Sequence, residues 1–268
     1  MKPAINADYP LLDPDEPSPV AVENPDGQAP VLLVCDHAQH RVPRRLQHLG
    51  LDPKLLAERH IGWDIGAACV TRRLMARLDA PAVFSSYSRL VIDLNRPPGD
   101  PTSILPVSDG VAVPGNEGLS PEEVEWRTEA LFWPYHHAVG QCLTRLHQRG
   151  PAPALVAIHS FTPEFEGLRR PWQVGVLWNH DPRIAEPLLH WLQRRDDLCV
   201  GDNEPYSGRE TGFTMEHHAA AAGLPHVCLE LRQDLIADEA GCAHWAEVVG
   251  EALEAVLSNA TLHQVEYH

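Results

Sequence analysis

Two histidines follow apolar segments of the chain, where an imidazole can be presented to a metal ion. His37 comes after Pro30–Cys35 and Asp36, and His159 ends the run Ala154–Ile158. An imidazole at the end of a buried strand has a fixed direction and can offer a neutral nitrogen to a metal. A catalytic zinc site adds a third protein ligand and leaves the fourth position to water. The pattern therefore predicts a divalent metal site, with zinc as the expected ion.

Several residues are candidates for the third ligand. Asp64 follows Trp63 at the start of a predicted helix and is the preferred candidate, although carboxylates at helix starts are common for electrostatic reasons alone. Asp36 can orient an imidazole ring. For His37 the alternative is a histidine that only satisfies loop carbonyl groups. Other candidates for the third ligand are His40, His60 and Glu58.

A carboxylate inside an apolar strand predicts a general base. Glu230 lies in Cys-Leu-Glu-Leu-Arg, where burial without a partner is costly. Desolvation would raise its pKa toward the range in which a carboxylate removes protons from water. The alternative is an ion pair with Arg232, two residues further along the same strand.

Arginines near another apolar run predict an anion site. Arg89 and Arg96 flank a segment that contains Asp93 and Asn95. A guanidinium can bind a carboxylate through two parallel hydrogen bonds, so Arg96 is expected to bind substrate with help from Asn95. Arg89 is a second candidate for binding the substrate carboxylate. Alternatively, it assists catalysis by stabilising an oxyanion, or it pairs with Asp93.

Two further residues are candidates for contact with substrate. Tyr206 lies in the turn-rich segment Asn203–Gly208, and His217 lies near the start of a predicted helix. Either residue also has an ordinary explanation, because Tyr206 can pack in a turn and His217 can be a surface histidine next to His218.

These residues need a scaffold in which strands alternate with helices. Short apolar runs predict strands, and amphipathic or capped segments predict helices. The alternation predicts an α/β fold with helices on both faces of a mixed, largely parallel sheet, and ligands of such sheets bind beyond the carboxyl ends of the strands. The expected strands cover 30–35, 82–87, 90–94, 154–158, 174–177 and 226–231, and the expected helices cover 53–59, 64–78, 120–149, 182–193, 214–222 and 240–257.

Composition limits the classes of partner. The chain of 268 residues is 44% hydrophobic, enough for a sizeable core, and its formal charge of −16 disfavours nucleic acid and anionic membranes. None of the six cysteines forms a CxxC pair, so we expect free thiols. With neither an apolar signal region nor a transmembrane run, the expected location is the cytoplasm.

The chain shows no linker between domains. We expect an extended N-terminal arm over residues 1–28 and one α/β domain over residues 29–268, as a monomer or small homo-oligomer. A second polar stretch, about residues 99–118, is short enough to be a loop or flap on that domain.

Five segments together resemble the N-formylglutamate amidohydrolase family, whose fold is similar to that of zinc carboxypeptidase-like exopeptidases. Asp-Leu-Asn-Arg-Pro is the most specific motif, and the first histidine is followed by Ala38-Gln39, where a small residue and glycine are more usual. The five segments span 34–43, 62–67, 88–97, 157–161 and 229–234.

The resemblance implies a cytoplasmic hydrolase that uses zinc to cleave the amide of a short N-acyl amino acid, such as N-formyl-L-glutamate in histidine degradation. It implies metal ligation by His37 and His159 with a carboxylate, Glu230 as base, and Asn95 with Arg96 as carboxylate binders. The alternatives are a metallocarboxypeptidase-like hydrolase of another amide and a non-catalytic binding protein for a small anionic metabolite. A serine hydrolase is less favoured, because no Gly-x-Ser-x-Gly motif surrounds Ser160.

Overall fold

A sheet of seven strands organises the protein, for which a computed structural model describes residues 11–210 and 212–268. The strand order is β1-β3-β2-β6-β11-β9-β10. The strands are β1 (Val20–Glu23), β2 (Val31–Cys35), β3 (Ala82–Ser85), β6 (Ala154–Phe161), β9 (Val174–Leu177), β10 (Val200–Asp202) and β11 (His226–Arg232). The hairpins β4 (Val107–Ser108)–β5 (Val111–Ala112) and β7 (Glu164–Phe165)–β8 (Leu168–Arg169) lie outside this sheet.

Most neighbouring strands of the sheet are parallel. Strands β3, β2, β6 and β11 run in one direction, and β9 and β10 are parallel to each other. The pairings β1–β3 and β9–β11 are antiparallel. The predicted α/β fold with a mixed, largely parallel sheet is therefore confirmed.

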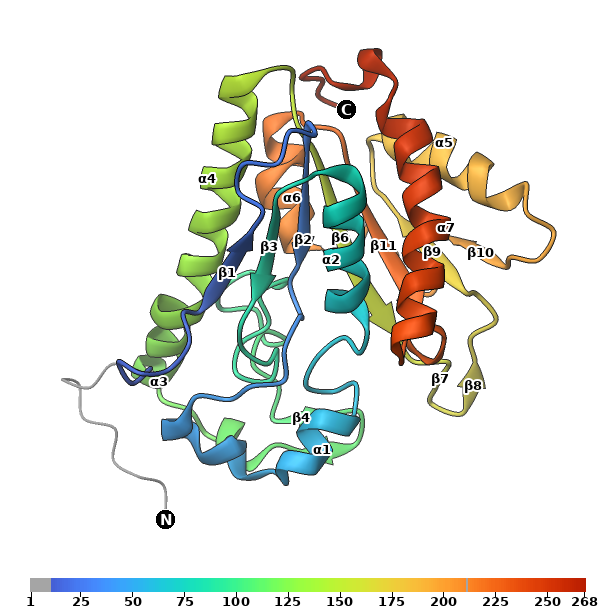
Figure 1. Ribbon diagram of the computed structural model, residues 1–268. Helices are drawn as coiled ribbons and strands as arrows, with labels where there is room; N and C mark the ends of the chain where they lie inside the picture. The colour runs from blue at the N-terminus through green and yellow to red at the C-terminus, as the bar shows by residue number, and fades with distance from the viewer. Residues whose placement is uncertain (1–10, 211) are drawn as a thin grey trace.

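Helices cover both faces of the sheet, as the apolar segments predict. One face packs against α2 (Ala67–Leu78), α5 (Pro182–Gln193) and α7 (Glu239–Leu257), and Figure 1 shows α2 and α7 in front of the strands. The other face packs against α4 (Trp133–Arg149) and α6 (Phe213–His218). Alternate strand residues divide between two apolar cores, so Ala157 and Cys228 lie on the side of α4 and α6.

Shorter helical segments complete the described chain. Two of them are α-helices, α1 (Pro53–Glu58) and α3 (Pro121–Arg127). The 3₁₀ segments are Arg44–Gly50, Pro114–Asn116, Ala220–Ala222, Gln233–Leu235 and Ala260–Leu262.

The predicted helix over 120–149 has the expected start but not a uniform interior. The Ser120 side chain accepts from the Glu123 backbone, and Glu123 accepts from the Ser120 backbone, so the capping box is formed. A π-helical segment, Thr128–Phe132, separates α3 from α4. Pro134, the second residue of α4, has no N–H to continue the α-helical hydrogen bonds. Its position accounts for the change of hydrogen-bond register there.

Two edge strands were not predicted. Strand β1 pairs with β3 and belongs to the domain, so the predicted arm over residues 1–28 is not separate throughout; its residues 1–10 lie outside the described residues. Strand β10 is only three residues long. Short edge strands bury little apolar surface and therefore leave a weak pattern in the sequence.

The apolar run Leu90–Leu94 was predicted as a strand but forms turns. Side chains replace the partner strand here. The Leu90 carbonyl accepts from Asn116, and the Val91 carbonyl accepts from Arg127 at 2.9 Å. The buried backbone is thereby satisfied without a ladder, as buried polar groups require.

Residues 99–118, which the sequence predicts to be a loop or flap, are attached to the domain through Arg127. This guanidinium is 2% exposed and donates to Asn116 Oδ1 at 2.7 Å and to the Gly115 carbonyl at 2.9 Å. Burial lowers the pKa of Arg127 to about 10. None of residues 97–118 lines the main cavity described below.

All six cysteines are free, in agreement with the sequence-based expectation. Cys199 is exposed, Cys69 is half-buried and the others are buried. Among the described helices none has the length and apolar character needed to span a bilayer.

We predict that Arg127→Ala lowers the free energy of unfolding by about 3 kcal/mol, because several buried carbonyl oxygens lose their donor. Urea denaturation at constant m-value measures the change. Arg194→Ala, at an exposed position after α5, is the control and should change stability by less than about 0.5 kcal/mol. Equal stabilities of the two variants would contradict this role of Arg127.

Candidate metal centre and substrate cavity

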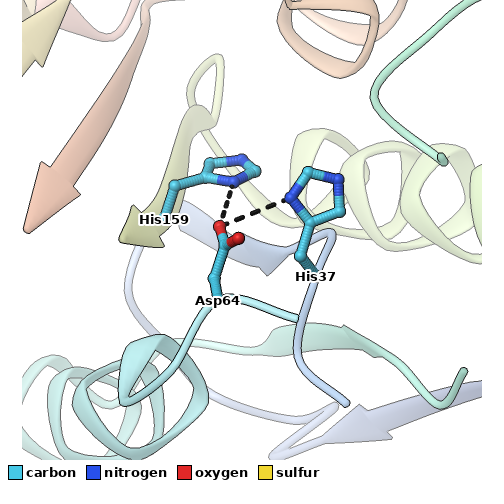
Figure 2. Close-up of side chains that lie close together, drawn as sticks. All are labelled: His37, Asp64 and His159. Atoms are coloured by element: carbon cyan, nitrogen blue, oxygen red, sulfur yellow. Dashed lines mark hydrogen bonds and ion pairs between the residues drawn. The ribbon is translucent and has the colours of Figure 1, made fainter. Parts of the chain in front are cut away.

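Three buried side chains converge beyond the parallel strands. Asp64 Oδ2 lies 3.3 Å from His37 Nδ1 and 2.8 Å from His159 Nδ1, and the three atoms all lie within 4.8 Å of one another. Figure 2 shows both rings directed at the carboxylate. His37 follows β2, His159 belongs to β6, and Asp64 precedes α2. Because β2 and β6 are parallel neighbours, their carboxyl ends bring the imidazoles together.

A separate carboxylate orients each imidazole ring. His37 Nε2 lies 2.7 Å from Asp93 Oδ1, and His159 Nε2 lies 3.0 Å from Asp36 Oδ2. Asp36 therefore orients the distant His159, not its neighbour in sequence. Asp36 is itself held by hydrogen bonds from Tyr135 Oη at 2.6 Å and Thr214 Oγ1 at 3.0 Å.

This donor set fits a divalent cation. If each Nε2 donates its proton to Asp36 or Asp93, both Nδ1 atoms present lone pairs to the oxygen of Asp64. Three acceptors at this separation repel one another unless positive charge lies between them. Two imidazole nitrogens and one carboxylate oxygen are a ligand set that zinc accepts.

The charges within the cluster raise the pKa of a histidine and lower the pKa of a carboxylate. Burial lowers the pKa of His159, but hydrogen bonds to the Asp36 and Asp64 carboxylates more than offset this effect and raise the pKa well above its ordinary value. Burial raises the pKa of Asp64, but the neighbouring histidines hold it well below the usual range. The site is therefore built to hold positive charge against buried carboxylates.

The alternative third ligands lie farther from this point. His60 Nε2 is 3.6 Å from Asp64 Oδ1, on the other carboxylate oxygen, and burial lowers the pKa of His60 to about 4. The His40 ring packs against Trp63. Glu58 is exposed and pairs with Lys54. Among the described residues, only His37, Asp64 and His159 form a group with metal-ligand spacing.

Glu230 lies beside the cluster, with one carboxylate oxygen that has no partner among the described residues. It is opposite His159 in the β6–β11 register and is 7% exposed. Its Oε2 is buried and accepts no hydrogen bond from the described residues. Desolvation raises the pKa of Glu230 to about 7, although His159 acts in the opposite direction. The alternative ion pair with Arg232 is not formed, because Arg232 pairs with Asp234.

The two arginines have different surroundings. Arg89 donates to Asp93 Oδ2 at 2.6 Å and lies 3.4 Å from Asp64 Oδ1, so the pairing weighed as an alternative is present. Arg96 donates to the Asn95 carbonyl, and no described carboxylate lies within ion-pair distance of it. Arg96 therefore retains donors for an anion.

The loop that carries Arg96 is fixed by two helices. The Thr214 backbone N–H in α6 donates to Asn95 Oδ1 at 3.0 Å. His136 Nε2 in α4 donates to the Leu94 carbonyl at 2.9 Å, which leaves His136 Nδ1 to accept from His218 Nε2. These contacts give Arg96 a defined backbone position next to the cluster.

One cavity contains most of the predicted site residues. Tyr206 lines it, and Arg170 donates to the Tyr206 hydroxyl at 3.1 Å from outside. The cavity is lined by His37, Asp64, Arg89, Asn95, Arg96, His159, Tyr206 and Glu230, together with the apolar residues Ala157, Leu177, Trp178 and Met215.

His217 is not brought to this cavity, which differs from the expectation for it. Met215 and Glu216 line the cavity from α6, whereas His217 stacks on Phe213, four residues earlier, with ring centroids 4.9 Å apart. Residues four apart share a helix face, so Phe213 and His217 lie together, whereas Met215, two residues from each, lies on the opposite face.

Sequence reasoning gave no role in the site to three buried polar residues. Asp93 was visible only as a partner for Arg89, and nothing in its position predicts a contact with His37. Tyr135 and His136 lie within a long helix, where periodicity treats them as core residues. The available signal was the presence of two polar side chains, a tyrosine and a histidine, at positions of this helix that are expected to be buried.

Comparison with known proteins defines the class of this fold and site. The family model described as N-formylglutamate amidohydrolase matches residues 29–237. Together with the α/β fold, the match identifies a hydrolase that acts on amide bonds. The chain belongs to the N-formylglutamate amidohydrolase family.

Individual proteins are similar to this chain in sequence or in fold. An N-formylglutamate deformylase from Pseudomonas putida is 27% identical over 250 residues, which cover 86% of this chain and 90% of that protein. The crystal structure of gene product Atu2144 from Agrobacterium tumefaciens is 35% identical with a TM-score of 0.90, over 94% of this chain and 99% of that one. An N-formylglutamate amidohydrolase structure from Ralstonia eutropha JMP134, 18% identical with a TM-score of 0.68 over 91% and 98%, shares the fold.

We predict that Asp93→Asn weakens metal affinity about 10- to 100-fold, because an amide cannot orient His37 as a carboxylate does. Titration of the metal-free protein with Zn²⁺ measures the affinity. Asp196→Asn, at an exposed position after α5, is the matched control and should bind as the unchanged protein does. Unaltered affinity in the Asp93 variant would remove Asp93 from the site.

Proposed function

We propose that the protein is a metal-dependent amidohydrolase that cleaves the amide of a short N-acyl amino acid. N-Formyl-L-glutamate is the first compound to test, because the names of the matching family and of the Pseudomonas putida relative contain it. The observation that carries the proposal is the buried Oε2 of Glu230, which has no hydrogen-bond partner in the described part of the chain, next to three metal-ligand atoms. Zinc is the expected ion, held by His37, Asp64 and His159.

Glu230 is proposed as the base. A bound divalent ion would polarise the amide carbonyl and make water a better nucleophile near neutral pH. Glu230 takes a proton from the attacking water as the new carbon–oxygen bond forms. It then gives that proton to the amide nitrogen as the carbon–nitrogen bond breaks, which yields a carboxylic acid and a free amino acid. Its raised pKa suits both transfers.

The remaining cavity residues are proposed to bind and orient the substrate. Arg96 has donors available for a carboxylate, and its neighbour Asn95 is fixed by Thr214. A carboxylate held there would place the amide for attack. Tyr206 contributes a hydroxyl at the cavity wall. Arg89, for which the sequence allowed a role as oxyanion donor, is proposed to hold Asp93 and Asp64 in place.

Glu230→Gln is predicted to lower kcat about 10²- to 10⁴-fold, because glutamine keeps the shape of the side chain but cannot take the proton. Zinc content and KM should change little. The measurement is steady-state hydrolysis of N-formyl amino acids, with Glu247→Gln, exposed on α7, as control. A fully active Glu230 variant would exclude Glu230 as the base.

Removal of metal is predicted to abolish hydrolysis, and one equivalent of Zn²⁺ should restore it, because the described residues form one group with metal-ligand spacing. Activity after dialysis against a chelator, followed by metal analysis and re-addition, measures this. If the metal-free protein turned over substrate at the original rate, the proposed metal dependence would be wrong.

A further inference from the structure

Arg170 is a cation beside the cavity to which the proposed reaction assigns no role. It directly follows the β7–β8 hairpin, which Figure 1 shows at the end of the sheet where β6 ends. The Arg170 backbone N–H donates to the Pro163 carbonyl at 2.9 Å and so closes the base of the hairpin. Because His159 lies near the end of β6, the hairpin holds Arg170 at the same edge of the sheet as the metal cluster.

The Arg170 guanidinium lies over three aromatic rings. Its Cζ is 4.7 Å from the ring centroid of Phe165, 4.9 Å from that of Tyr206 and 5.9 Å from that of Phe161. Contacts of this kind hold a guanidinium in place while N–H groups at its edge stay available for hydrogen bonds. Because Tyr206 also lines the cavity, the ring that holds Arg170 is part of the cavity wall.

Part of the donor capacity of Arg170 is unused. Its Nη1 donates to Tyr206 Oη at 3.1 Å and to Thr162 Oγ1 at 3.2 Å. In the described part of the chain, Nε and Nη2 have no hydrogen-bond partner, and no carboxylate lies within ion-pair distance of the guanidinium. The Tyr206 oxygen accepts from Arg170, so the phenolic hydrogen can be donated to another group. Arg170 and Tyr206 together therefore offer several donors to an anion.

The charge of Arg170 acts on groups that line the cavity. Burial is the main cause that lowers the pKa of His60 to about 4, and Arg170 adds to this effect. Burial and Glu230 raise the pKa of the Tyr206 hydroxyl, whereas Arg170 and Arg89 act in the opposite direction. The Tyr206 hydroxyl is thus close to groups beside the metal cluster as well as to Arg170, within reach of a short substrate side chain.

A substrate with two carboxylates needs more positive charge than the cavity lining supplies. Of the described lining residues, Arg89 and Arg96 alone carry a permanent positive charge. Arg89 is engaged by Asp93 and Asp64, so Arg96 remains for one carboxylate. A second carboxylate without a partner would be costly in a partly buried site. N-Formyl-L-glutamate has two carboxylates, and Arg170 can supply the missing charge.

Another arginine near the cavity provides a comparison. Arg209 lies over the ring of Trp178, a lining residue, at 5.8 Å from the centroid. Its side chain is exposed, and its guanidinium donates to none of the described residues that line the cavity. Solvent screens an exposed charge of this kind. Arg209 therefore lacks the link to the cavity that Tyr206 gives to Arg170.

We propose that Arg170, acting with the Tyr206 hydroxyl, is a specificity-determining residue that binds the side-chain carboxylate of a dicarboxylic N-acyl amino acid. This inference rests on the proposed amidohydrolase function. Arg96 binds the carboxylate next to the scissile amide. Tyr206 donates to the carboxylate of the side chain, and Arg170 contributes its charge and a further N–H. A substrate with an uncharged side chain of similar size leaves these donors without a partner and is a poorer substrate.

The experiment uses the zinc-loaded protein with N-formyl-L-glutamate and N-formyl-L-norvaline, in which a methyl group replaces the side-chain carboxylate. For the unchanged protein we expect kcat/KM to favour the glutamate compound at least about 10-fold. Arg170→Gln should lower this glutamate-to-norvaline ratio at least about 10-fold, mainly through a higher KM for the glutamate compound, because a charge-assisted pair is lost. A structural role for Arg170 would affect both substrates alike, and an unchanged ratio would overturn the inference.

Two further variants complete the test. Tyr206→Phe keeps the ring over which Arg170 lies but removes the hydroxyl, and it is expected to lower the ratio several-fold. It also decides the question if Arg170→Gln does not fold, since an unchanged ratio in Tyr206→Phe contradicts the proposed carboxylate site. Arg209→Gln is the matched control and should keep the original ratio. A fall in Arg209→Gln as large as in Arg170→Gln would show a general effect of charge and would overturn the assignment to Arg170.

The norvaline compound separates this inference from the proposed function. Its hydrolysis requires the cluster, Glu230 and Arg96, and it offers no carboxylate to Arg170. Turnover of norvaline without a preference for glutamate contradicts only the role of Arg170. No turnover of either compound by the zinc-loaded protein would overturn the proposed function, and this inference with it.

Discussion

Mutual repulsion of three acceptor atoms is the constraint on which the site depends. His37, His159 and Asp64 meet at one point, and their lone pairs are tolerated there only around positive charge. The backbone strengthens the arrangement, because the Asp64 N–H donates to the His37 carbonyl at 2.9 Å and the Ser160 N–H donates to Asp64 Oδ2 at 3.2 Å. Hydrogen bonds from main-chain N–H groups thus connect the ligand residues, in addition to the contacts between their side chains.

The surrounding network explains why so many ionisable groups are buried together. Asp36 and Asp93 hold the rings, Arg89 balances Asp93, and helix α4 supplies Tyr135 to Asp36. Each buried charge would be costly alone, and each has a hydrogen-bonded partner. Glu230 differs from these groups. Its free oxygen is a local cost to stability, and such a cost is typical of a group that is kept available for chemistry.

The site residues that lie at the ends of strands could be predicted from the sequence. His37, His159 and Glu230 could be placed because apolar runs of five to eight residues end at or contain them, and parallel pairing then fixes their common edge. Asp93 and His136 could not be placed, because their roles arise from contacts between segments 42 or more residues apart. The turn at Leu90–Leu94 was misjudged for the same reason, since Asn116 and Arg127 supply its hydrogen bonds from elsewhere in the chain.

The reversed direction of β9 has a consequence for how the enzyme can diverge. Because β9 is antiparallel to β11, Leu177 lies opposite Cys228, and the loop after β9 enters the sheet region from the side away from the metal ligands. The wall contributed by 177–179 is separate in the chain from His37, Asp64 and His159, whereas the wall contributed by 212–216 also supports His159, because Thr214 donates to Asp36. Substitutions in 177–179 can therefore reshape this part of the cavity wall without altering the ligand group of His37, Asp64 and His159.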